Sequence, residues 1–163
     1  MNKKIFLALF FYFLLHFSVS AEIVQVFDFT KEEMQNLKVK KVKGKTTYTL
    51  GLNENGNFLK AEAEGKASGL GKKVDINLLK TPFINITWKV DKDLSGIVEN
   101  SKNGHDYAAR VFVIKKIGST ALSNRAINYV FSSNNNIGDN WHSPYTKKSI
   151  DYVLSTTKNH KNQ

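Results

Sequence analysis

Apolar and polar residues alternate with a period of two over most of the chain after residue 45. The alternation runs through residues 45–52 (KTTYTLGL) and resumes in residues 58–70 (FLKAEAEGKASGL). Between them, residues 53–57 (NENGN) are rich in Asn and Gly, which tolerate left-handed backbone conformations and favour tight turns. This pattern predicts a β-hairpin with one polar face.

Further strands are predicted downstream, and residues 107–116 (YAARVFVIKK) are apolar on both faces. A two-sided apolar strand is typical of the centre of a sheet that is covered front and back. The other predicted strands are residues 83–90 and 125–133, the polar loops are residues 91–104, 116–124 and 133–146, and the one helix candidate is residues 31–39. Many short strands with regular turn signals indicate an all-β antiparallel sandwich or barrel.

The first 21 residues have the layout of a secretory signal peptide. Lys3 and Lys4 precede an apolar run over residues 5–17, and small residues lead to a plausible cleavage site before Glu22. As a helix the apolar run would rise only about 20 Å, whereas a bilayer core needs roughly 30 Å. We therefore predict export and no stable membrane span, the alternative being an uncleaved anchor. A single domain would then cover residues 22–155, followed by a polar tail over residues 156–163.

Cysteine content and charge narrow the location and the partners. The chain has no cysteine, which suits an exported protein of a bacterial periplasm that builds its core without disulfides. Its formal charge of +10 comes almost wholly from lysine. Proteins that recognise nucleic acids usually depend on the bidentate hydrogen bonds of the arginine guanidinium group. Scattered lysines favour a solvated surface and no nucleic-acid partner, although anionic glycans or lipid head groups could also bind them.

Asp106 and Arg110 stand four residues apart at the head of the apolar run. On one strand they would share a face about 13 Å apart, so they can touch only if the strand begins after Asp106. One interpretation is a structural ion pair that sets strand register, and the other is a pair lining a ligand groove. We expect replacement of Arg110 with alanine to destabilise the fold by about 3–5 kcal/mol, the range for breaking a buried ion pair.

No motif in the chain predicts a metal site, a cofactor or a named catalytic centre. His105, His142 and His160 lack the close spacing that places two metal ligands on one element, and no G-x-S-x-G elbow is present. Trp141 and Tyr145 instead lie in a loop rich in Asn. Aromatic faces beside amide edges suit a sugar ring, although both rings could simply close the end of a sandwich.

Five blocks of the chain resemble, in order and spacing, the bacterial domain of unknown function 3047 family. They are Ala67–Leu70, Pro82–Val90, Gly104–Val113, Ile127–Ser132 and Ser143–Tyr145, and the resemblance covers about residues 29–155. It implies an exported β-sandwich of jelly-roll type with no settled activity. The family usually continues further, so the resemblance also implies that this chain lacks its last strands. An open sheet edge would then favour self-association.

Three features depart from the family pattern. At Thr87 and Trp88 a single tryptophan replaces the more usual x-Trp arrangement nearby. His105 stands where the family usually has the first of two acids, and Phe131 stands where it usually has tryptophan. A ligand role for that acid pair therefore does not carry over directly to this chain.

The function that these patterns favour is non-catalytic binding of a saccharide or another envelope component in the periplasm or outside the cell. The predicted ligand-binding residues are Trp88, Asp106, Arg110, Tyr129, Trp141 and Tyr145. One alternative is a glycan hydrolase or lyase that uses Asp106 and a second carboxylate. Another is a structural envelope protein without a small ligand.

Overall fold

A computed structural model describes residues 22–157 of the chain. It divides into two compact units, the first ending at Asn85 and the second beginning at Ile86, and each is described by itself. The predicted signal peptide and the end of the polar tail lie outside the described residues. Across residues 22–157 the mostly β character is confirmed, with one short α-helix and three sheets, none of which closes on itself. The single predicted domain stays a prediction.

The helix α1 (Lys31–Asn36) begins at a capping arrangement that its sequence encodes. The hydroxyl of Thr30 accepts a hydrogen bond from the backbone N–H of Glu33 at 3.1 Å. The Glu33 carboxylate in turn accepts from the backbone N–H of Phe29 at 2.8 Å. Reciprocal bonds of this kind satisfy donors that a helix start leaves free. The helix lies within the predicted range of residues 31–39 but ends early, and a strand follows.

The described part of the first unit contains two strand pairs, one nested inside the other in the sequence. The inner pair, β2 (Thr47–Asn53) and β3 (Gly56–Glu62), is antiparallel and joined by a tight turn. It confirms the hairpin that the alternation predicted. The outer pair joins β1 (Lys38–Lys43) to β4 (Ala67–Gly71), also antiparallel, with a bulge at Val42.

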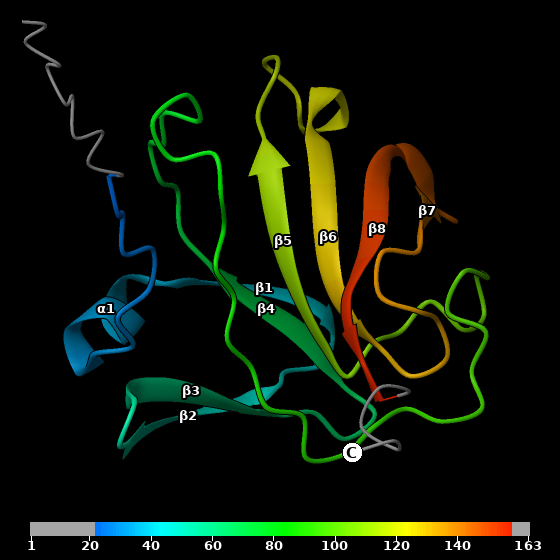
Figure 1. The fold of residues 1–163 in the computed structure, drawn as a ribbon, viewed down its shortest axis with the longest axis horizontal. Coiled ribbons are helices and arrows are strands. Elements are labelled where there is room, and N and C mark those ends of the chain that lie inside the picture. Colours follow the sequence, from blue (N-terminus) through cyan, green and yellow to red (C-terminus); the bar gives the residue numbers. More distant parts are fainter. Residues whose placement is uncertain (1–21, 158–163) are drawn as a thin grey trace, which may run out of the picture. The chain divides into compact units, whose positions relative to one another are not determined.

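The second unit contains a four-stranded sheet in the order β5-β6-β8-β7 (Figure 1). The strands are β5 (Ala109–Lys115), β6 (Arg125–Ser132), β7 (Asn140–Ser143) and β8 (Thr146–Thr156), and a turn of 3-10 helix covers Ala121–Ser123. β6 and β8 are parallel, so the prediction of a wholly antiparallel arrangement was wrong, while the two outer pairings are antiparallel. The predicted strand at residues 125–133 is thereby confirmed.

Three strand predictions need correction. β5 is an edge strand of the described sheet with Phe112, Val113 and Ile114 exposed, so the prediction of a central, covered strand was wrong. Residues 83–90 form no strand, because alternation becomes a strand only where a neighbour supplies the ladder of hydrogen bonds. Conversely, β8 crosses a region for which no strand was predicted, and it occupies the interior of the sheet.

The core of the second unit is small and lies on one face of its sheet. Val130 of β6 and Val153 of β8 are fully buried against Tyr107, and Trp141 of β7 packs against them. Among residues 22–157, no helix is long and apolar enough to cross a membrane.

Candidate functional site

The register of the second sheet separates its side chains into two chemically different faces. Asn128, Asp151 and Trp141 form one cross-strand row on what we call the inner face, together with the core valines. Ile127 and Ile150 form a row on the opposite, outer face. Side chains alternate between faces along a strand, so Tyr129 and Tyr152 also belong to the outer face, where they are paired. The two faces are therefore separate candidates for a functional site.

The inner face holds a buried polar cluster centred on Asp151, whose exposure is 1%. Nε2 of His105 lies 2.7 Å from one carboxylate oxygen of Asp151, and the Asn128 amide donates to the other at 2.7 Å. Burial by itself would raise the pKa of Asp151, but hydrogen bonds from His105 and Asn128 outweigh it and hold that pKa below its usual value. Asp151 is therefore an ionised, fully paired carboxylate.

Two tyrosines enclose the imidazole of His105. Tyr107 and Tyr145 both contact it edge to face, with ring centroids 5.4 Å away in each case. Burial, followed by the charges of Asp151 and Glu99, raises the pKa of Tyr107, which keeps its hydroxyl neutral. A His–Asp pair can orient a general base in hydrolases, but this ring is covered on two sides. The geometry indicates a pair that joins the loop before β5 to β8.

A second buried carboxylate, Glu99, anchors the same loop to the turn after β6. It accepts hydrogen bonds from the backbone N–H of Ser133 at 2.7 Å, from the Asn135 amide at 2.6 Å and from the Ser132 hydroxyl. Its exposure is 1%. Glu99 therefore has a structural environment and no route to a solvent-borne substrate.

Asp106 and Arg110 contact each other because β5 begins only at Ala109. A guanidinium nitrogen of Arg110 lies 3.4 Å from a carboxylate oxygen of Asp106. The guanidinium also lies over the rings of Tyr107 and Phe112, at 5.4 Å and 5.7 Å from their centroids. Because 65% of the Asp106 side chain is exposed, this ion pair is not buried. The expected loss of 3–5 kcal/mol on removing Arg110 was therefore wrong.

Replacing Arg110 with alanine should lower the free energy of unfolding by about 1 kcal/mol, through loss of an exposed ion pair and its ring contacts. Urea denaturation of the two proteins measures the difference. The Arg110→Lys variant keeps the charge and loses only the planar stacking, so it should fall between them. A loss of 3 kcal/mol or more would restore the buried-pair interpretation.

The outer face carries a shallow hollow with a volume of about 510 Å³. Tyr129 and Tyr152 form its aromatic part, with ring centroids 6.1 Å apart and an interplanar angle of 72°. Ile127 and Ile150 supply aliphatic lining, and the amide of Asn140 supplies a polar edge. No carboxylate lines this hollow. Apolar surface with one convergent amide is suited to binding a small molecule, not to acid–base chemistry.

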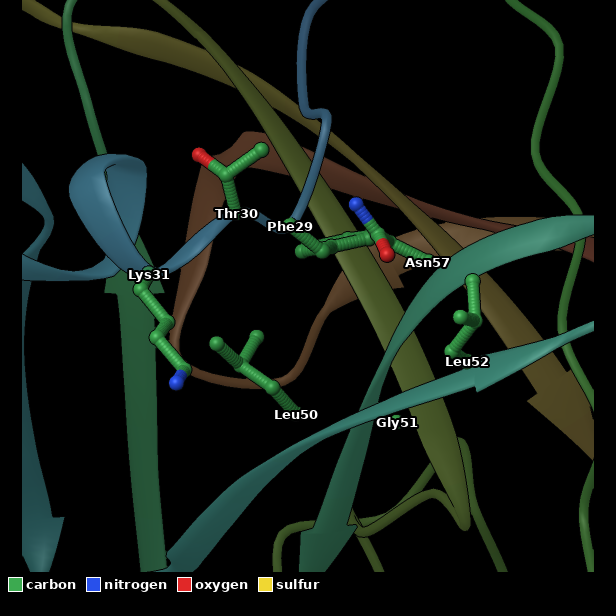
Figure 2. A pocket seen from close by; sticks show the side chains of 7 residues that line it. All are labelled: Phe29, Thr30, Lys31, Leu50, Gly51, Leu52 and Asn57. Atoms are coloured by element: carbon green, nitrogen blue, oxygen red, sulfur yellow. The ribbon is translucent and has the colours of Figure 1, made fainter.

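The first unit has a smaller hollow of about 360 Å³ beside the start of α1, shown in Figure 2. Its lining is mainly apolar, with one cationic residue: Phe29, Thr30, Lys31, Leu50, Gly51, Leu52 and Asn57. None of the predicted ligand-binding residues contributes to it.

The structure divides the six predicted ligand-binding residues among three places. Tyr129 alone lines the outer hollow. Trp88 packs edge to face on Phe131 and donates its indole N–H to the Ser155 hydroxyl at 2.7 Å. The other four surround the inner face near Tyr107 and His105: Asp106, Arg110, Trp141 and Tyr145.

Sequence reasoning missed Tyr152 and Asn140 in the hollow, and Asp151 in the buried cluster. The alternation of Ser149, Ile150, Asp151 and Tyr152 was an available signal for a strand. Within residues 22–157, no group of three or more His, Cys, Asp or Glu residues could hold a metal ion.

Comparison with known proteins found one family. The family model described as "Protein of unknown function (DUF3047)" matches residues 32–163. Searches of curated proteins and of solved structures found no match.

Proposed function

Since the chain belongs to the DUF3047 family, whose description assigns no activity, we propose from its own residues that it binds a saccharide without chemical conversion. The binding site would be the outer hollow lined by Tyr129, Tyr152 and Asn140. The single observation that carries this proposal is the pairing of two aromatic rings with an amide at an open sheet face.

A sugar ring has an apolar C–H face and a polar edge of hydroxyl groups. Tyr129 and Tyr152 present ring surface to the first, while Asn140 can both donate to and accept from the second. Tyr152 is 36% exposed, so a ligand could reach the ring without a conformational change. The volume of about 510 Å³ lies within the usual range for small-molecule sites.

The hydrolase alternative has less support, because glycoside hydrolysis needs two carboxyl groups roughly 5–10 Å apart on either side of the scissile bond. The hollow contains none. Asp106 pairs with Arg110. Arg110 lies opposite the inner-face residue Val130 of β6, and neither Asp106 nor Arg110 lines the outer hollow. Glu99 and Asp151 are buried in structural networks.

The signal-peptide pattern of residues 1–21 supports a periplasmic or secreted location, where cell-wall glycans are the available saccharides. We also propose this location for the protein, together with the jelly-roll arrangement that the family resemblance implies. We further propose self-association along the open edge of β5.

Alanine variants at Tyr129 and Tyr152 test the site. Each should weaken saccharide binding roughly tenfold, since one aromatic contact contributes up to about 1.5 kcal/mol. The ligands would be soluble peptidoglycan fragments and a panel of neutral oligosaccharides, with affinity measured by isothermal titration calorimetry. Tyr145→Ala is the matched control, because Tyr145 is also an exposed tyrosine but packs on His105.

Equal affinity of both alanine variants and the original protein would refute the site. Absence of binding to every saccharide at millimolar concentration would favour a structural envelope protein. Release of reducing ends from a glycan would favour the hydrolase.

A further inference from the structure

The bulge in β1 places three lysines on one face of the outer strand pair. Lys38 pairs with Gly71 and Lys40 with Gly69, and beyond the bulge at Val42 Lys43 pairs with Ala67. Gly71, Gly69 and Ala67 are two residues apart and so share a face. In an unbroken strand Lys43 would share the opposite face with Val39 and Lys41. The bulged residue therefore turns Lys43 to the side of Lys38 and Lys40, and we call these three residues the lysine face.

β4, the strand beside these lysines, has almost no side-chain bulk on this face. Its contributions to the lysine face are two glycines and one alanine, Gly69, Gly71 and Ala67. Open space extends at least 4 Å from where a Cβ atom would lie on either glycine. All six residues of β1 are exposed. A broad surface could therefore approach the ammonium groups without meeting bulky neighbours.

Within residues 22–85, no ion pair engages a lysine of the lysine face. The ion pairs in this range engage other lysines, namely Lys60, Lys72 and Lys80. Two more lysines extend the positive region past the end of β1. Lys45 is two residues beyond Lys43 in the chain. Lys66 lies close to Gly44, because a methyl group on Gly44 would be 3.0 Å from Cγ of Lys66.

We propose that the lysine face docks the protein onto an anionic lipid bilayer. The first unit contains no arginine, so its positive groups are lysine ammonium ions. A hydrated ammonium group suits a diffuse anionic surface, whereas the bidentate guanidinium of arginine suits a single phosphate. Successive lysines of the lysine face lie about 7 Å apart along the strand. Beside them, Val42 is 76% exposed and offers an apolar contact to the lipid interface. Each lysine near an anionic leaflet strengthens binding roughly fivefold.

This inference concerns the first unit and does not depend on saccharide binding in the second. It is tested with the purified full chain and two sets of vesicles, one of phosphatidylcholine alone and one of phosphatidylcholine mixed with the anionic lipid phosphatidylglycerol. Sedimentation should show binding to the anionic vesicles, loss of that binding in about 0.5 M salt, and little binding to neutral vesicles.

The Lys38→Gln/Lys40→Gln/Lys43→Gln variant should bind the anionic vesicles on the order of 100-fold more weakly. A matched variant, Lys115→Gln/Lys116→Gln/Lys147→Gln, removes the same charge from exposed positions of the second unit and should lose far less. Single variants test the face itself: Lys43→Gln should weaken binding about fivefold, and Lys41→Gln, from the other face of β1, should weaken it less.

Three results would overturn the proposal. Equal loss in the two triple variants would show that net charge alone drives binding. Equal binding to neutral and anionic vesicles would remove the electrostatic basis. Stronger binding to a soluble polyanion, such as polyphosphate or duplex DNA, than to anionic vesicles would assign the lysine face to a different partner.

Discussion

Replacing Asp151 with alanine is expected to lower the free energy of unfolding by about 3–5 kcal/mol, the largest effect of any substitution considered for this protein. The reason is that Asp151 is buried between His105 and Asn128 at 2.7 Å from each. Its removal leaves an imidazole and an amide without their partner in the interior. Urea denaturation followed by tryptophan fluorescence measures the loss.

The same carboxylate predicts how stability depends on pH. Because the pKa of Asp151 is lower in the folded protein than its ordinary value of 3.8, its contribution is complete above about pH 4. The contribution is lost as pH falls through the folded-state pKa. The difference in unfolding free energy between the original protein and Asp151→Ala should therefore narrow below pH 4.

Asp106→Asn is the matched control for Asp151→Ala. It removes an aspartate from an ion pair of similar chemistry, but one whose carboxylate side chain is 65% exposed. A loss below about 1 kcal/mol is expected. Similar losses at Asp106 and Asp151 would contradict the assignment of Asp151 as the buried anchor of the loop.

Replacing Glu99 with glutamine is expected to lower the free energy of unfolding by about 3 kcal/mol. Three donors, from Ser132, Ser133 and Asn135, converge on the buried carboxylate. A glutamine amide would turn its own N–H donors toward some of them, leaving buried donors unsatisfied. Thermal unfolding followed by circular dichroism measures the change.

Glu62→Gln is the control for Glu99→Gln, because Glu62 makes an exposed ion pair with Lys60 in β3. Its effect should stay below about 1 kcal/mol. If Glu99→Gln kept full stability but abolished an activity on glycans, Glu99 would be a catalytic acid and the structural assignment would be wrong.

Local features were predictable from sequence wherever the interacting residues are close in the chain. The inner hairpin of the first unit follows from alternation on both sides of an Asn- and Gly-rich turn, and its register places Asn53 opposite Gly56. The short helix likewise follows the N-cap residue Thr30, with Glu33 three residues after that cap, a capping signal readable in the sequence. Such features need no distant partner.

The composition of the second sheet's faces could not be predicted in the same way. In β8 the apolar residues Ile150 and Tyr152 are exposed at 38% and 36%, whereas Asp151 between them is buried. An alternating pattern identifies a strand but assigns its apolar side to the interior. Here Asp151 is stable in the interior because His105, 46 positions away, and Asn128 supply its hydrogen bonds.

The sequence by itself determined the mostly β character, the family, the inner hairpin and the excess of lysine. The tertiary structure decided that Tyr129 contacts Tyr152 on the outer face and that His105 contacts Asp151 on the inner face. It also decided that Lys43, beyond a bulge, shares a face with Lys38 and Lys40. Strand pairing and register depend on contacts between distant segments, and one inserted residue reverses the side to which every later side chain points.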